Sequence, residues 1–201
     1  MLIIYSIIIA LVFSIFGIMV LNNYKTKRIK NEEIRLFQTA NIVADTYKGN
    51  MEDIVFARIM VKSYGKQANA RILVVDSNKK VLIDNYNSYI GKTLDNDEIK
   101  SSLKGKSKSG LYSIDRKEVL QLSVPIAMNT GLETKVIGAV LISASMESIN
   151  SDIENLRKDI LTISAFALAI ALILTAIASN NMTKPLRNLI HGVEKVSSGD
   201  L

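Results

Sequence analysis

The sequence contains no cysteine and no tryptophan, and only one histidine and two prolines among its 201 residues. Without cysteine, the chain can form neither a disulfide scaffold nor a cysteine-ligated metal site. Charge is missing from two long stretches, residues 1–24 and 160–183, whereas all but five of the 44 charged residues lie between residues 25 and 159. The composition therefore predicts a membrane protein with a charged middle domain.

Each uncharged stretch is long enough to cross the hydrocarbon core of a bilayer, which takes about 20 helical residues. We predict transmembrane helices at residues 2–21 and 160–178. A cleaved signal peptide is the alternative for the first, but it needs a basic start and a small-residue cleavage site. No Lys or Arg precedes Lys25, and the stretch ends in the bulky sequence IMVL. We therefore expect an uncleaved anchor.

Basic residues after the second span indicate the orientation of the chain, because they favour the cytoplasmic side. These residues are Lys184, Arg187 and Lys195. Both termini are then inside, and residues 22–158 form one extracellular domain of a multi-pass cell-membrane protein. The four basic residues within 25–30 depart from the rule, although long loops cross a membrane largely regardless of charge. This topology excludes nucleic acid as a partner of the middle domain.

The hydrophobic periods of the middle domain predict an α+β fold. Helical spacing continues from the first span to about residue 48, and a second amphipathic helix is expected at residues 52–64, ended by Gly65. Its inward-facing residues are predicted to be Ile54, Val55, Ile59 and Met60. A short helix is expected at residues 95–103, and strands are expected at residues 72–75, 81–83, 110–115, 119–127 and 135–143. The prediction is thus a mainly antiparallel sheet of about five strands, with the long N-terminal helix on one face.

An apolar seam begins after the last strand and enters the second span without a break. Its members follow a 3-4-3-4-3 heptad spacing: Met146, Ile149, Ile153, Leu156, Ile160 and Ile163. The seam predicts one helix between sheet and membrane that faces its mate in a dimer. The alternative is that the stripe packs against its own domain.

Beyond the second span, residues 181–186 are expected to start a further helix, with Pro185 in the first turn, where its missing N–H costs nothing. The segment at residues 182–201, MTKPLRNLIHGVEKVSSGDL, resembles the first half of a HAMP linker. That family has a proline near the helix start, apolar heptad positions and a Gly-Asp-Leu connector. The matching residues are Pro185, Leu186, Leu189, Val193, Val196 and Gly199.

The middle domain contains the segments RILVVDSNKKVLIDNYNSYIGKTL, residues 95–105, LQLSVPI and VIGAVLISASMESI. With these segments it resembles a single Cache, or extracytoplasmic PAS-like, sensor domain. In the order span, sensor domain, span and HAMP, the chain resembles the N-terminal sensory region of a bacterial sensor histidine kinase of a two-component system. Chemoreceptors and cyclases carry HAMP linkers too, so the sensory part of either is an alternative.

The resemblance implies a homodimer that detects an extracellular small molecule or protein. It further implies that a histidine kinase domain beyond residue 201, using ATP and Mg, signals to a cytoplasmic response regulator. These 201 residues hold no recognisable catalytic site, and no cofactor is expected in them. A different class of function stays open, namely a non-enzymatic membrane anchor or protein-docking module without a pocket.

Candidate ligand-binding residues come from the connector after the second strand and from the strands that it covers. They are Arg71, Asp84, Tyr86, Tyr89, Tyr112, Gln121 and Ser123. Tyrosine supplies both an apolar wall and a polar group, and Arg71 would pair with a ligand carboxylate. The alternative is that Tyr86 and Tyr89 only cover the sheet edge, while Asp84 caps a turn.

Two other features favour structural interpretations. His191 has no acidic residue directly after it, which favours a solvated helix residue over a phosphoacceptor. Asp95, Asp97 and Glu98 are typical of a helix N-terminus, where carboxylates interact favourably with the helix dipole. We therefore predict no metal site.

Overall fold

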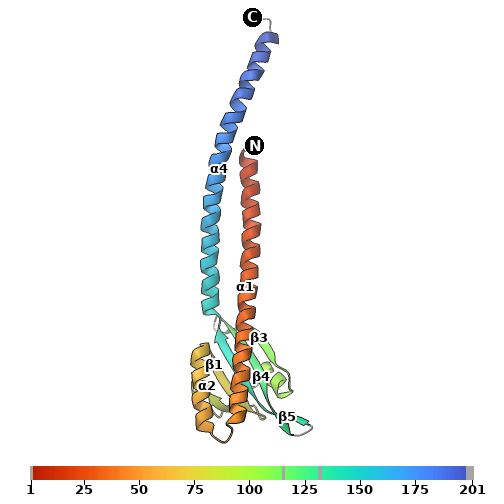
Figure 1. Ribbon diagram of the computed structural model, residues 1–201, viewed down its shortest axis with the longest axis vertical. Coiled ribbons are helices and arrows are strands. Elements are labelled where there is room, and N and C mark those ends of the chain that lie inside the picture. The colour runs from red at the N-terminus through yellow and green to blue at the C-terminus, as the bar shows by residue number, and fades with distance from the viewer. Residues whose placement is uncertain (1, 115, 131–132, 198–201) are drawn as a thin grey trace. The chain divides into compact units, whose positions relative to one another are not determined.

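The computed structural model describes residues 2–114, 116–130 and 133–197, and the chain divides into two compact units. One unit combines Met1–Tyr24 with Asp152–Leu201, and the other is Lys25–Ser151. The elements in chain order are α1 (Leu2–Gly49), α2 (Ile54–Ala68), β1 (Arg71–Asp76), β2 (Val81–Asp84), α3 (Asp97–Leu103), β3 (Lys108–Ile114), β4 (Lys117–Thr130), β5 (Glu133–Ser145) and α4 (Glu147–Ser197) (Figure 1).

The unit formed by residues 25–151 contains a five-stranded sheet in the order β2-β1-β5-β4-β3. Every neighbouring pair is antiparallel, which confirms the predicted sheet. The hairpin of β4 and β5 is longer than predicted, because pairing extends to Thr130 and Glu133. Strand β4 alternates as its sequence indicates, since Leu120, Leu122, Val124 and Ile126 are all buried.

Helices α1 and α2 lie on one side of this sheet, with α2 running back beside the last part of α1 (Figure 1). Leu36, Ala40 and Val43 of α1 are fully buried, as are Ile72 and Val74 of β1. The predicted long helix over one sheet face is therefore confirmed.

The inward face of α2 is not the one that the sequence predicts. Ile54, Val55 and Ile59 are exposed, and Met60 is only half-buried. The buried residues of this helix are Ala57, Val61, Gly65 and Ala68. Small residues are needed because the connector comes close, and a Cβ on Gly65 would overlap the Asn85 amide. The helix also continues past Gly65 to Ala68, where Asn69 ends it with a left-handed backbone (φ 50°).

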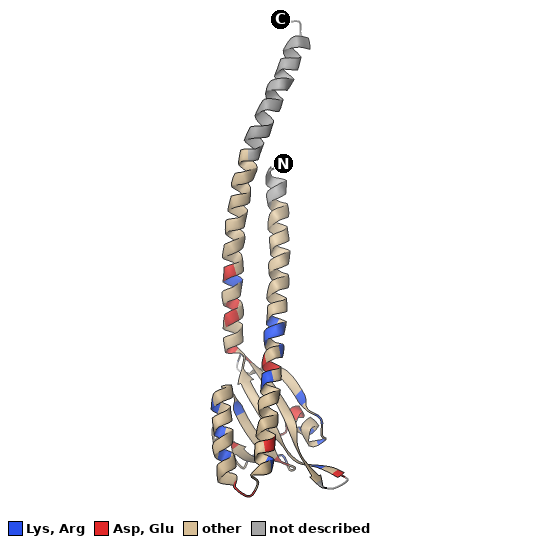
Figure 2. Ribbon diagram, viewed as in Figure 1, with Lys and Arg blue, Asp and Glu red and all other residues tan. Residues whose placement is uncertain are grey.

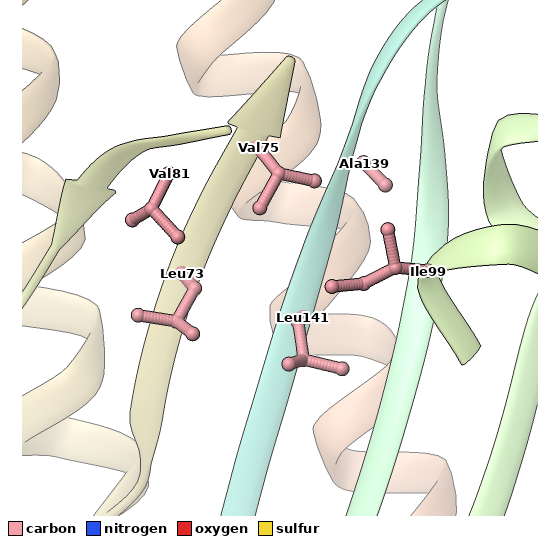
Figure 3. Close-up of a cluster of buried hydrophobic side chains, with 6 residues drawn as sticks. All are labelled: Leu73, Val75, Val81, Ile99, Ala139 and Leu141. Atoms are coloured by element: carbon pink, nitrogen blue, oxygen red, sulfur yellow. The ribbon is translucent and has the colours of Figure 1, made fainter. Parts of the chain in front are cut away.

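The opposite sheet face is covered by α3 and by the connector after β2. The buried cluster there consists of Leu73, Val75, Val81, Ile99, Ala139 and Leu141 (Figure 3). Tyr89, Leu94 and Leu103 pack against it. This part of the face is a closed apolar core.

Two helices each hold a segment long and apolar enough to cross a membrane, within Ile7–Gly49 of α1 and Glu147–Ile177 of α4. Figure 2 shows the corresponding uncharged stretches of both helices. Helix α4 is continuous to Ser197, so the separate helix predicted from residue 181 is not found. Pro185 removes one backbone N–H from a helix of 51 residues, and the helix continues through it. Gly199 lies outside the described residues.

Candidate functional site

Pairing across the sheet places polar residues of three strands in one row. Arg71 of β1 pairs with Ser143 of β5, Ser143 pairs with Gln121 of β4, and Gln121 pairs with Gly110 of β3. Directly paired residues share a face of the sheet. We call Arg71, Ser143 and Gln121 the polar row, which Gly110 of β3 continues to the edge of the sheet. It lies on the α3 side, next to the apolar core.

Arg71 forms an ion pair with Asp84 at the β1 end of the row. Its Nη2 and Nε lie 2.7 Å and 3.3 Å from the two carboxylate oxygens. The guanidinium also stacks 4.0 Å from the centroid of the Tyr89 ring and 5.7 Å from that of Tyr86. The structure thus brings four of the seven predicted ligand residues together, but Arg71 is paired with a carboxylate of its own chain.

The Asp84 carboxylate also organises the connector. It accepts hydrogen bonds from the backbone N–H groups of Tyr86, Ser88 and Tyr89, at 3.0, 2.8 and 2.9 Å. Burial raises the pKa of the Asp84 carboxyl, but these bonds and the Arg71 guanidinium outweigh it and hold the pKa below its ordinary value. Asp84 therefore caps a turn, as the structural alternative expects.

The β3 end of the row carries a second buried carboxylate, that of Glu98 on α3. The Tyr112 hydroxyl donates a hydrogen bond to it across Gly110. A Cβ on Gly110 would lie 2.8 Å from the Tyr112 ring and 2.9 Å from Glu98 Oε1, so only glycine leaves room for this bond. The hydrogen bond to Glu98, followed by burial, raises the pKa of Tyr112 to about 12. The sequence prediction missed Glu98, which it assigned to a helix N-terminus.

Polar groups beneath α3 retain unused hydrogen-bonding capacity. Within the described part of the chain, Gln121 Oε1 accepts only a long bond of 3.4 Å from Asn96. The hydroxyls of Ser102 and Ser123 are buried and have no hydrogen-bond partner among the described residues. Such groups are uncommon in folded proteins. Tyr112, Gln121 and Ser123 thus form a second group, separated by β5 from the one around Arg71.

A different cluster lies where the helices α1 and α4 meet the sheet. Glu118 of β4 lies 3.7 Å from Lys25 of α1 through Oε1 and accepts a 3.0 Å hydrogen bond from Asn150 of α4 through Oε2. Its backbone carbonyl accepts a 2.9 Å bond from the N–H of Met146, the single residue between β5 and α4. We call this the Glu118 junction. In the sequence, Glu118 is only a carboxylate near the start of a strand. Such residues are common, so the sequence did not predict the Glu118 junction.

Further contacts support the same junction. Lys117 pairs with Glu147 at 3.1 Å. A cavity of about 320 Å³ lies beside it, lined by α1 residues such as Arg35 and by Ser148 and Ile149 of α4. Met146 and Ile149 of the predicted seam are buried inside their own domain, as the alternative to dimer packing expects at these two positions. Ile153, Leu156 and Ile160 are half-buried, and Ile163 is exposed.

Comparison with known proteins identifies the fold. Residues 57–144 match the family model of the WalK sensor protein kinase Cache domain. The sensor domain of Escherichia coli DcuS is a structural neighbour with 16% identity and a TM-score of 0.51, covering 62% of this chain and 96% of that one. No curated protein matches the sequence significantly.

Two other solved structures have the same fold. The ligand-binding domain of the Campylobacter jejuni chemoreceptor Tlp3, in complex with 4-methylisoleucine, has 16% identity, a TM-score of 0.52 and coverage of 74% of this chain and 63% of that one. An extracellular ligand-binding receptor from Desulfohalobium retbaense has 15% identity, a TM-score of 0.51 and coverage of 69% and 26%. The chain thus spans less than two thirds of either protein. The Cache-like α+β fold predicted from the sequence is confirmed.

Proposed function

We propose that this chain, which carries a Cache domain of the type found in sensor histidine kinases, is the sensory part of a two-component membrane receptor. Its domain at residues 25–151 detects an extracellular small molecule or protein. The signal passes through α4 and the HAMP-like segment to a histidine kinase domain beyond residue 201, within a homodimer in the cell membrane.

The Glu118 junction is the observation that carries this proposal. One side chain contacts Lys25 of α1 and Asn150 of α4, the helices that also contain the two apolar segments. Strand β5, which lies in the middle of the sheet, passes into α4 through Met146 alone. A rearrangement of the sheet therefore changes the start of α4 directly, because no flexible linker separates them.

The polar row is the proposed place of signal detection. The Tyr86 and Tyr89 rings stack on Arg71 at the β1 end of the row, and Arg71 already has Asp84 as its partner, so a ligand would act by exchanging that partner. A signal molecule shifts a two-state receptor only by its difference in affinity for the two states, and about 5.5 kcal/mol moves the ratio from 1:99 to 99:1. Removing the partner of a buried ion pair such as Arg71 and Asp84 costs about 3–5 kcal/mol, which is of that order.

A chimaera with a measurable output tests the proposal. Residues 1–201 are joined in register to a HAMP-containing histidine kinase core, and autophosphorylation is measured in isolated membranes. Glu118→Ala, combined with Asn150→Ala, removes the side-chain contacts of the junction. We expect basal kinase activity to change severalfold, because the start of α4 loses its side-chain bond to β4 and keeps only the backbone bond of Met146 and the neighbouring contacts.

Glu52→Ala is the matched control, because it removes an exposed carboxylate far along the chain from the junction. Protein levels in the membrane are compared for all variants by immunoblot. Equal basal activity in the junction variant and the control, at equal protein levels, would show that the sheet and α4 are not coupled in this way.

A further inference from the structure

Helix α2 has two apolar faces, of which the sheet uses only one. Its small residues Ala57, Val61, Gly65 and Ala68 face the sheet. Its larger residues lie outside, with Val55 63% and Ile59 61% exposed. Met51, Ile54 and Phe56 are exposed beside them. We call Met51, Ile54, Val55, Phe56 and Ile59 the α2 strip. Such a run of large exposed apolar residues marks an interaction surface.

A row of cations follows one edge of the α2 strip. Arg58, Lys62 and Lys66 recur at intervals of four residues, which places them on one side of the helix. All three are exposed, and none forms an ion pair within the part of the chain that the structure describes. The surface next to the strip is therefore positively charged and uncompensated.

A recess adjoins this edge. It has a volume of about 200 Å³ and is lined by Arg58, Ile59 and Lys62 of α2 together with Asp84, Asn85 and Asn87. Asp84 is already bonded to Arg71, so the two α2 cations are the charged groups left to meet an incoming side chain. A cavity of this size between an arginine and a lysine fits one carboxylate side chain.

A second copy of the chain is a poor occupant of this surface. A symmetric contact through α2 would bring Arg58, Lys62 and Lys66 of both copies into one interface, and α2 itself contains no acidic residue to pair with them. Like charges opposed across an interface cost free energy and suppress the pairing.

We propose that the α2 strip docks an amphipathic segment of another protein that carries apolar and acidic side chains. The apolar side chains of that segment pack on Val55 and Ile59, and one of its carboxylates enters the recess between Arg58 and Lys62. This interaction goes beyond signal detection at the polar row, because the α2 strip itself lies on the opposite side of the sheet and the recess shares only Asp84 with the group around Arg71.

Defined peptides test the proposal. The probes are fluorescent helical peptides with leucines on one face and either glutamates or lysines beside them, titrated onto the full chain in nanodiscs of zwitterionic lipid. Fluorescence anisotropy is expected to show binding of the glutamate peptides at least tenfold tighter than that of the lysine peptides. Val55→Asn with Ile59→Asn should weaken the glutamate peptides at least tenfold. Arg58→Glu with Lys62→Glu should invert the preference.

The matched control is Leu111→Asn with Ile114→Asn, which alters two exposed apolar residues of β3 at the other edge of the sheet. This variant should bind as the unaltered chain does, and circular dichroism spectra should be the same for all variants. The proposal would be overturned if glutamate and lysine peptides bound equally tightly, or if the control variant lost as much affinity for the glutamate peptides as Val55→Asn with Ile59→Asn.

Two further outcomes assign the surface to another occupant and also overturn it. One is a dimer in sedimentation velocity that Val55→Asn with Ile59→Asn converts to monomer, since the strip would then bind a second copy. The other is binding of vesicles containing phosphatidylglycerol, lost in Arg58→Glu with Lys62→Glu, while no glutamate peptide binds. The surface would then be a lipid contact.

Discussion

Asp84 carries a buried charge that five hydrogen bonds hold in place. Two come from Arg71 and three from the backbone of the connector. A buried carboxylate is costly unless it is paired in this way. Asp84 therefore fixes the shape of the connector, and with it the position of the Tyr89 ring over Arg71. Any ligand that draws Arg71 away must also accommodate this carboxylate.

Asp84→Asn should lower the free energy of unfolding by about 2–3 kcal/mol at pH 7, because Arg71 and the backbone donors lose a charged acceptor. The folded-state pKa of Asp84 lies below its unfolded value. Its contribution is thus fully present above the unfolded pKa of about 3.9 and is lost as the pH falls through the folded pKa. Urea unfolding from pH 7 to pH 3 should show a smaller loss of stability in the variant.

The control for this measurement is Asp97→Asn, which alters an exposed carboxylate on α3. Its unfolding free energy should differ by less than about 0.5 kcal/mol from that of the unaltered chain, as at most surface positions. An Asp84→Asn variant with the same dependence on pH as the unaltered chain would show that Asp84 has no depressed pKa.

The sequence identified several residues of the candidate site by their residue type, but it did not predict which residues they contact. Tyr89 and Asp84 stand out as aromatic and acidic residues in a connector, and the structure brings them together with Arg71. The sequence left Arg71 free for a ligand, because its pairing depends on how β1 registers with β2. Glu98 and Glu118 were missed, since a carboxylate near a helix start or a turn is common and its burial depends on distant strands.

Hydrophobic periodicity located α2 but predicted the wrong face. Large apolar residues are the strongest indication of a buried helix face, and in α2 these are Ile54, Val55 and Ile59. Packing against the sheet instead requires Gly65 and alanines, because the connector at Asn85 comes within contact of the helix. A helix with two apolar faces can bury either face against the sheet, and the sequence pattern is the same in both cases. Only the separation of helix and sheet, which the sequence does not contain, decides between them.

Cross-linking tests the apolar seam of α4, and the absence of native cysteine makes single replacements unambiguous. In a homodimer, Ile153→Cys and Leu156→Cys should form disulfides in membranes more readily than Ser151→Cys or Asn155→Cys. The reason is that heptad positions face the mate helix. Ile149→Cys should react little, because this residue is buried in its own domain. Equal yields at all four partly exposed positions would contradict a coiled-coil seam.

The order of helices and strands along the chain was predicted from where the spacing of apolar residues changes between the helical and the strand pattern. Strands were placed correctly because alternation and turn residues mark them locally, and only their ends differ, as in the longer β4–β5 hairpin. The continuity of α4 through Pro185 was not predicted. A proline favours the start of a new helix, and the sequence does not show when a long helix continues through it instead. The HAMP-like segment stays a prediction.

Labelling of single cysteines tests the membrane topology. Lys106→Cys, in the loop before β3, should react with a membrane-impermeant maleimide in intact cells. Ser197→Cys, at the end of α4, should react only after the cells are permeabilised, because the basic residues after the second span favour the cytoplasm. The reverse labelling pattern would place the Cache-like domain inside the cell.

Because only Met146 separates β5 from α4, the connection also fixes the rotation of α4 about its own axis. Each residue of an α-helix turns the chain by about 100° and advances it by about 1.5 Å. Since α4 is continuous from Glu147 to Ser197, the direction of every later residue is set by where the sheet ends. One added residue would redirect everything beyond it by a quarter turn or more, whereas seven would restore the direction to within about 20°. Under the proposed function, a signal that reaches α4 from the end of β5 would therefore rotate the helix about its axis as well as displace it.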